Sequence, residues 1–269
     1  MGRDRARLLG GVVAVVAVLG LVGCGRVATP ATSGPRAAVA TVAVLDTGID
    51  PSVRLDGRLD RARSKSLVPG EGLADADGHG TAMASIVHAA APEAKVVVVK
   101  VAGTTGTTDA RLAEGIDQAA AVGVDVVLVA QAGAGALPRT HRAIERAGRR
   151  GVLVVAAAGN DGVDLGAHPA HPAADVAPNL VAVAATDRRG SLLGSSNRGA
   201  PIGARGDGEA VPACGLGGEQ TTATGTSPAA ALVAARAARF VAEGRRATST
   251  AVRRELGRGW ARAARVRCP

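Results

Sequence analysis

Residues 39–45 read VATVAVL, a nearly continuous apolar run of the length of one strand. Four runs of the same kind follow it: VVVVKV at 96–101, VDVVLV at 124–129, VLVVAA at 152–157 and LVAVA at 180–184. Strands that are apolar on both faces are typical of a parallel sheet with helices on each side. The five runs therefore predict the strands of one mainly parallel sheet.

Stretches with a helical pattern separate most of these strands and follow the last one. Within residues 109–121, for example, Leu112, Ile116 and Ala119 recur at helical spacing. The alternation of strands and helices indicates a doubly wound α/β fold, and we expect a single domain from residue 39 to residue 269. In such a sheet, functional side chains lie at the carboxyl ends of the strands. The predicted helices cover residues 80–90, 109–121, 139–150, 227–243 and 248–256.

The composition favours a large packed core and argues against nucleic acid as a partner. Hydrophobic residues make up 47% of the 269 residues, while Phe240 and Trp260 are the sole aromatic side chains. The formal net charge of +9 permits an anionic partner. However, the charge is scattered along the chain, and the aromatic stacking platforms that bind single strands are missing. We therefore expect no nucleic-acid partner.

The first 23 residues have the pattern of a secretory signal peptide. Arg3, Arg5 and Arg7 precede an apolar run from Leu8 to Gly23. This run is shorter than the roughly 20 residues that cross a bilayer, although a transmembrane anchor stays open as the alternative reading.

The sequence Leu21-Val22-Gly23-Cys24 at the end of this run resembles a bacterial lipobox. The resemblance implies that Cys24 is lipidated and holds the protein at the extracytoplasmic face of the cell membrane. Residues 24–38 are rich in Gly, Pro, Ser and Thr, which indicates a flexible tether. We expect no prodomain, because the segment between Cys24 and the first predicted strand is too short for one. Cys214 and Cys268 are free to pair in an exported protein, but their spacing does not settle whether they do.

Four polar side chains follow strands or begin helices, where each has a structural as well as a functional interpretation. Asp46 ends the first strand, and its carboxylate is either catalytic or a turn cap. His79 lies between two glycines at the start of a helix, where a neutral imidazole can act as a base. Ser227 begins another helix, as an N-cap or as a nucleophile that gains from nearby amides. Asn160 follows the strand at 152–157 and offers a side-chain amide as a hydrogen-bond donor.

Taken together, the segments around these residues resemble the signature segments of the subtilisin-like serine proteases, or subtilases. The segments are VAVLDTGID at 42–50, DGHGTAMASIV at 77–87, VVAAAGNDG at 154–162 and TGTSPAAALVAA at 224–235. The order Asp, His, Ser along the chain is that of subtilisin. The weaker similarity extends from about Val39 to Leu256.

The resemblance implies a serine endopeptidase that acts on protein or peptide substrates. Ser227 would attack the scissile carbonyl, His79 would take and return the proton, and Asp46 would orient the imidazole. Asn160 and the backbone N–H of Ser227 would bind the oxyanion. Two alternatives stay open: a catalytically weak lipoprotein that uses the subtilase scaffold for binding or assembly, and an esterase with the same triad.

The chain departs from the usual subtilase pattern at the expected substrate edge and after the nucleophile. Ala130, Gln131 and Ala132 stand where many subtilases have Ser-Leu-Gly, and with Ala158 and Gly159 they are the expected substrate-binding residues. Pro228 directly follows Ser227. Proline is favoured at the first position of a helix, but it disfavours the helical conformation in the residue before it, so we expect Pro228 to affect the placement of Ser227.

We expect no cofactor. The short link at residues 89–95 replaces a loop that binds calcium in many subtilisins, and Asp75 with Asp77 is too small a ligand set for that ion. A weaker calcium site elsewhere stays open. The remaining histidines have no spacing typical of metal ligands: His88, His141, His168 and His171.

Overall fold

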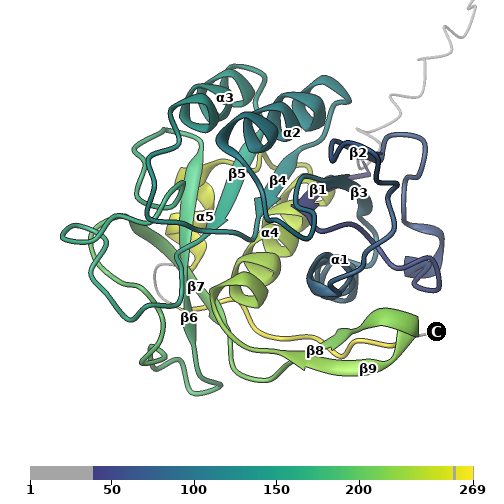
Figure 1. Ribbon diagram of the computed structural model, residues 1–269. Helices are drawn as coiled ribbons and strands as arrows, with labels where there is room; N and C mark the ends of the chain where they lie inside the picture. The colour runs from purple at the N-terminus through teal and green to yellow at the C-terminus, as the bar shows by residue number, and fades with distance from the viewer. Residues whose placement is uncertain (1–38, 257–258, 269) are drawn as a thin grey trace, which may run out of the picture. The chain divides into compact units, whose positions relative to one another are not determined.

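The computed structural model describes residues 39–256 and 259–268 (Figure 1). The expected signal peptide, the lipidation site at Cys24 and the tether at 24–38 lie outside the described residues. Within the described part of the chain, no helix combines the length and apolar character needed to cross a membrane.

A seven-stranded sheet forms the centre of the domain, and all of its strand pairs are parallel. The strand order is β2-β3-β1-β4-β5-β6-β7. This confirms the predicted parallel α/β architecture. The strands are β1 (Thr41–Asp46), β2 (Lys65–Ser66), β3 (Lys95–Lys100), β4 (Val126–Val129), β5 (Leu153–Ala157), β6 (Leu180–Thr186) and β7 (Ile202–Asp207).

Helices cover both faces of the sheet (Figure 1). Alternate residues of β1 show the two layers: Ala43 and Leu45 pack with the core under α2 and α3, whereas Val42 and Val44 pack with the core under α1 and α4. The ends of the predicted helices shift by at most one residue. The helices are α1 (His79–Ala90), α2 (Asp109–Ala121), α3 (Pro138–Arg149), α4 (Thr226–Ala242) and α5 (Ser249–Leu256), with short 3₁₀ turns at Leu55–Gly57 and Leu216–Gly218.

The strand order creates a switch point at β1, which lies between β3 and β4. The chain reaches β3 through α1 on one face and leaves β3 for β4 through α2 on the other face. Ligands of doubly wound sheets bind at such a point, outside the carboxyl ends of the strands. Asp46 is the last residue of β1, Ala130 follows β4, and Asn160 lies three residues after β5, so the topology brings all three to this edge.

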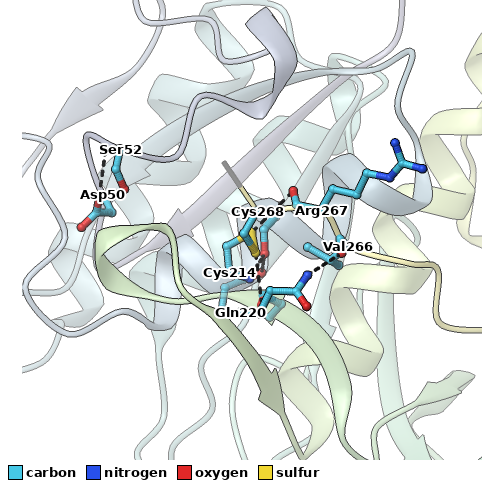
Figure 2. Close-up of a disulfide and its surroundings, with 10 residues drawn as sticks. Asp50, Ser52, Cys214, Gln220, Val266, Arg267 and Cys268 are labelled. Atoms are coloured by element: carbon cyan, nitrogen blue, oxygen red, sulfur yellow. Dashed lines mark hydrogen bonds between the residues drawn. A yellow bond between two sulfur atoms is a disulfide. The ribbon is translucent and has the colours of Figure 1, made fainter.

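An antiparallel hairpin of β8 (Val211–Cys214) and β9 (Gln220–Ala223) lies outside the main sheet and precedes α4. A disulfide joins Cys214 to Cys268 in the C-terminal tail, with Cα atoms 5.5 Å apart (Figure 2). Gln220 also donates from Nε2 to the carbonyl of Val266 at 3.0 Å. The backbone N–H of Cys214 donates to Ser85 Oγ on α1 at 2.9 Å, so the hairpin contacts the helix that carries His79.

Candidate active site

Asp46 presents a wholly buried carboxylate at the end of β1. His79 Nδ1 donates to Asp46 Oδ1 at 2.8 Å, and the backbone N–H of Thr47 donates to the same oxygen at 2.8 Å. The second oxygen, Oδ2, is buried without a hydrogen-bond partner among the described residues. Asp46 therefore both caps its own turn and orients the ring of His79.

Asp75 holds the start of α1, and with it His79, in place, a role that the sequence did not predict. Asp75 Oδ1 accepts from the backbone N–H groups of Asp77 and Gly78, at 3.0 and 2.9 Å. Asp75 Oδ2 accepts from the backbone N–H and the hydroxyl of Thr81, at 2.9 and 2.6 Å. A carboxylate before the helix thus satisfies N–H groups that have no partner within the helix. The sequence signal for this cap is an Asp three residues before Gly78, the N-cap residue of α1.

Gly80 allows α1 to approach the end of β1 closely. A Cβ atom at this position would lie 2.5 Å from the carbonyl oxygen of Gly48 and 3.1 Å from Cβ of Asp46. The backbone N–H of Gly80 donates to Thr47 Oγ1 at 2.9 Å. The distance between His79 and Asp46 therefore depends on a residue without a side chain at position 80.

Opposing effects act on the imidazole of His79, whose side chain is 36% exposed. Burial lowers its pKa, but the hydrogen bond and the charge of Asp46, together with the charges of Asp77 and Asp75, outweigh burial. The pKa of His79 is consequently raised above its usual value of 6.5.

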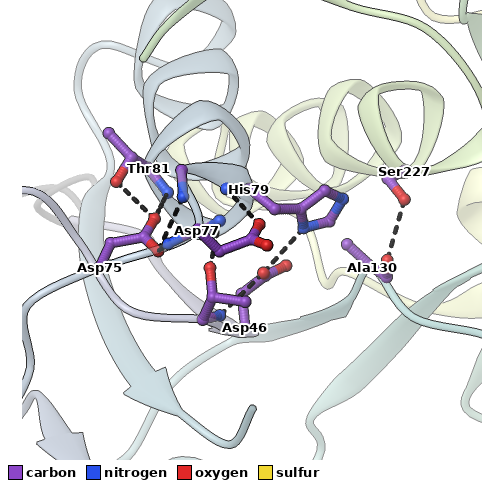
Figure 3. A network of polar contacts seen from close by, with 10 residues as sticks. Asp46, Asp75, Asp77, His79, Thr81, Ala130 and Ser227 are labelled. Carbon is purple, nitrogen blue, oxygen red and sulfur yellow. Dashed lines mark hydrogen bonds and ion pairs between the residues drawn. The ribbon is translucent and has the colours of Figure 1, made fainter. Parts of the chain in front are cut away.

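Ser227 is the second residue of α4, and Figure 3 shows the His79 ring directed from the end of β1 toward the start of this helix. The Ser227 hydroxyl donates to the carbonyl oxygen of Ala130 at 2.9 Å. The N-cap of α4 is Gly225, so the alternative interpretation of Ser227 as an N-cap was wrong. Pro228 is the third helical residue, and the residue before it, Ser227, lies within the helix. Pro228 fits there because its nitrogen belongs to the first turn, whose N–H groups have no intrahelical acceptor.

Asn160 is exposed at the same edge, and its orientation is set by Thr226, the wholly buried first residue of α4. The backbone N–H of Thr226 donates to Asn160 Oδ1 at 2.9 Å. The hydroxyl of Thr226 accepts from the backbone N–H of Gly159 at 3.1 Å. This pair of bonds joins the Asn160 loop to the helix of Ser227. Because Oδ1 is used as an acceptor, the amide group Nδ2 is the part of Asn160 that is left to donate.

The five expected substrate-binding residues belong to two segments, residues 130–132 after β4 and residues 158–159 after β5. Ala130 is buried and gives its carbonyl to Ser227, whereas Gln131 is half-buried and Ala132 is exposed. Ala158 is wholly buried and Gly159 is buried, which places both behind the accessible edge. The accessible part of the expected substrate edge is therefore the segment after β4.

Three further histidines of the described residues lie beside carboxylates. Among residues 39–256 and 259–268, no group of three or more His, Cys, Asp or Glu side chains is arranged to hold a metal ion. His88 Nε2 lies 3.1 Å from Asp56 Oδ2. His171 and His141 both face Asp175, His171 through a close contact of Nδ1 with Oδ1 and His141 at 3.6 Å from Oδ2.

Residues 38–258 match the subtilase family, peptidase S8. The chain is 33% identical over 231 residues to Subtilisin Savinase of Lederbergia lenta, a match that covers 80% of this chain and 82% of that protein. It is also 33% identical to an alkaline protease of Alkalihalobacillus alcalophilus, where the match covers 80% of this chain and 58% of the longer relative.

Two solved structures are similar over most of the chain. A cold-adapted subtilisin-like serine proteinase has a TM-score of 0.69 at 27% identity, covering 80% of this chain and 79% of that one. A lanthipeptide protease has a TM-score of 0.75 over 84% of this chain and 86% of that one. At 20% identity, this second likeness concerns the fold alone.

Proposed function

The chain belongs to the subtilase family and is a subtilisin-like serine endopeptidase, and we propose that Asp46, His79 and Ser227 are its catalytic triad. The observation that carries the proposal is the hydrogen bond of 2.8 Å between His79 Nδ1 and the buried carboxylate of Asp46. It assigns the proton of the neutral ring to Nδ1 and leaves Nε2 as the acceptor.

The reaction begins when the Ser227 hydroxyl leaves the carbonyl of Ala130 and turns toward Nε2 of His79. Nε2 takes the hydroxyl proton while Oγ bonds to the carbonyl carbon of the substrate peptide. The negative charge that develops on the carbonyl oxygen is bound by Nδ2 of Asn160 and the backbone N–H of Ser227. The C–N bond of the substrate then breaks as the imidazolium gives its proton to the leaving amine, and Ser227 is left acylated. In the second half of the reaction, Nε2 takes a proton from water as the water oxygen bonds to the acyl carbon. The bond between the acyl carbon and Oγ then breaks as the proton passes to Oγ, which releases the acid and restores Ser227.

We propose in addition that residues 1–23 are a signal peptide and that lipid on Cys24 anchors the enzyme at the outer face of the cell membrane. The support is the lipobox-like sequence at 21–24 and the disulfide between Cys214 and Cys268, a bond typical of exported proteins. Growth with a labelled fatty acid tests the anchor. We expect label and membrane fractionation in the full chain and loss of both in Cys24→Ser, whereas a Cys24→Ser protein that stays labelled contradicts it.

Labelling with a fluorophosphonate, beside hydrolysis of casein, tests the triad in the detergent-solubilised full chain. We expect both signals in the wild-type protein and neither in Ser227→Ala or His79→Ala. Ser191→Ala, at an exposed turn, is the matched control that keeps both. A folded wild-type protein that neither labels nor cleaves would instead support the binding or assembly role. Labelling with cleavage of esters but not of casein would support the esterase.

A further inference from the structure

Asn197 is a buried amide in the connection from β6 to β7 that plays no part in the reaction as described above. Its exposed fraction is 0%, and it lies in an irregular segment between Ser196 and Arg198. A fully buried amide is retained at low cost only when its donors and acceptors are satisfied. The partners of Asn197 therefore indicate what the residue holds in place.

The hydrogen-bond partners of the Asn197 side chain all belong to the loop that follows β5 and carries Asn160. Asn197 Oδ1 accepts from the backbone N–H groups of Asp161 and Val163, at 3.0 and 3.1 Å. Asn197 Nδ2 donates to the carbonyl of Ala158 at 2.9 Å and to Asp161 Oδ2 at 3.3 Å. Its own backbone N–H donates to the carbonyl of Gly159 at 3.0 Å. The loop thus closes around one side chain.

Gly159 shows how closely the loop fits this amide. Its φ is +98°, and a Cβ atom there would lie 2.5 Å from Asn197 Nδ2. A residue at position 159 therefore needs both the left-handed conformation and the absence of a side chain. The loop therefore fits closely around the Asn197 amide only because position 159 has no side chain.

Asn160 lies in this loop between two residues that Asn197 binds, Gly159 and Asp161. Its side-chain oxygen Oδ1 accepts from the backbone N–H of Thr226 at 2.9 Å. We propose that Asn197 is a positioning residue that fixes the Asn160 amide where the oxyanion develops. The inference rests on the proposed role of Asn160 as an oxyanion donor.

The kinetic signature follows from when the donor acts. An oxyanion donor binds the transition state and not the ground state, so its displacement lowers kcat and leaves KM unchanged. Complete removal of this donor costs roughly 10²- to 10³-fold in kcat, a magnitude known from subtilisin itself. Because Asn197→Ala displaces the amide without removing it, we expect a loss of about 10- to 100-fold.

The test is a double-mutant cycle in the full chain, with wild type, Asn197→Ala, Asn160→Ala and the double variant. Fluorophosphonate titration counts the active enzyme, and a chromogenic peptide gives kcat and KM. We expect Asn197→Ala to lower kcat alone, and to cost less than about threefold when Asn160 is already Ala, because residues that act as one unit are not additive.

Asn179→Ala is the matched control. Like Asn197, this amide makes two donations from Nδ2, here to the backbone carbonyls of Ile144 and Val152 at 2.9 and 3.0 Å. It directly precedes β6, however, and so lies at the amino ends of the strands, away from the candidate site. We expect it to lower the temperature of unfolding and to leave kcat unchanged. A comparable loss of kcat in Asn179→Ala would mean that general loosening, and not the position of Asn160, explains the result.

The remaining outcomes separate the two proposals. If Asn160→Ala is costly but a folded Asn197→Ala keeps its full kcat, the positioning role is overturned and the oxyanion role survives. The positioning role is also overturned if Asn197→Ala changes KM rather than kcat, or if it lowers kcat equally when Asn160 is already Ala. If Asn160→Ala keeps full activity, both proposals fail.

Asn197→Asp covers the case in which Asn197→Ala does not fold. The carboxylate keeps the two acceptor bonds but loses both donations and faces the Asp161 carboxylate. We expect kcat to fall in Asn197→Asp and to recover in part when Asp161→Asn is added, because the new amide donates across the same contact. A swap that recovers nothing contradicts the role of this contact.

Discussion

His79 donates to Asp46 at 2.8 Å across the boundary between the interior and the solvent, because the Asp46 carboxylate is wholly buried whereas the His79 side chain is 36% exposed. The buried charge is thus fixed in place, and the ring that it holds is accessible to a substrate. The same contact decides at which pH the ring is neutral.

The pH profile of kcat/KM tests this contact. Burial lowers the pKa of His79, yet Asp46 and the two nearby carboxylates raise it above 6.5 overall. A base must be neutral to act, so we expect activity to fall as the pH drops through an apparent pKa above 6.5. Asp46→Asn removes the charge that raises the pKa of His79, so the acid limb of the pH profile moves to lower pH. The plateau value of kcat/KM falls by about 10⁴-fold, because the tautomer of His79 is no longer fixed.

Asp77→Asn is the control for the charge alone. Asp77 Oδ1 accepts from the backbone N–H of His79 at 3.1 Å, a bond that the Asn amide oxygen retains. We expect a small shift of the acid limb to lower pH with an unchanged plateau. An acid limb that does not move in Asp46→Asn contradicts the assignment of His79 as the base.

Asp75 is expected to stabilise the fold in a pH-dependent manner. Burial raises its pKa, but the hydrogen bonds from Thr81 and Gly78 outweigh burial and lower it below the usual value of 3.8. A carboxyl with a lowered pKa in the folded state stabilises the protein above the pKa of the unfolded state, and this stabilisation is lost as the pH falls through the folded pKa.

We expect Asp75→Asn to lower the free energy of unfolding at pH 7 by about 1–3 kcal/mol. The reason is that the NH₂ group of Asn would face N–H or O–H groups that donate to a carboxylate oxygen in the wild-type protein. The difference from the reference should begin to shrink once the pH falls below about 4. Urea unfolding measures it, with Ser227→Ala as the common background to prevent self-cleavage. A difference that stays constant down to pH 2 would mean that the carboxylate charge is not what stabilises α1.

The disulfide is expected to stabilise the region between β8 and the C-terminal tail. Cys214 and Cys268 are separated by 54 positions. Closure of a loop of this size contributes about 4 kcal/mol in the chain-entropy description, at the upper end of the typical contribution of roughly 2–4 kcal/mol. A reductant should therefore lower the temperature of unfolding of the Ser227→Ala protein. The double variant Cys214→Ala and Cys268→Ala should already unfold at the lower temperature and not respond to the reductant. An equal response in both proteins would assign the effect to another group.

The central strands could be predicted from the sequence for a physical reason, whereas the triad stays a proposal. Strands β1, β4 and β5 are buried on both faces, so their composition alone marks them, and each functional residue next to them is fixed by the topology. Strand β7 escaped prediction because its sequence IGARGD carries Arg205 and two glycines and is partly exposed. The polar side chains that hold the site in place escaped as well. Asn197 and Asp161, for example, are 36 positions apart, and no local pattern links them.

Gly80 gives the sharpest test of how closely α1 and β1 must approach. In the first turn of a helix, Gly→Ala ordinarily stabilises by up to about 1 kcal/mol. Here the new Cβ would lie 2.5 Å from the Gly48 carbonyl, which belongs to the backbone and has no rotamer to change. We therefore expect Gly80→Ala to push His79 away from Asp46 and to lower both stability and kcat, the latter by about tenfold or more, since an error of 1 Å in a catalytic group costs up to about 100-fold.

Gly72→Ala is the control, because a Cβ atom at this position meets no atom within 4 Å and the residue has no positive φ. This variant should keep its kcat and its temperature of unfolding, as measured by peptide hydrolysis and calorimetry. If Gly80→Ala equals wild type in both measurements, α1 has room to move and the close packing at Gly48 does not set the distance between His79 and Asp46. If stability falls but kcat does not, the contact supports the fold alone, and the alignment of His79 depends on the cap at Asp75.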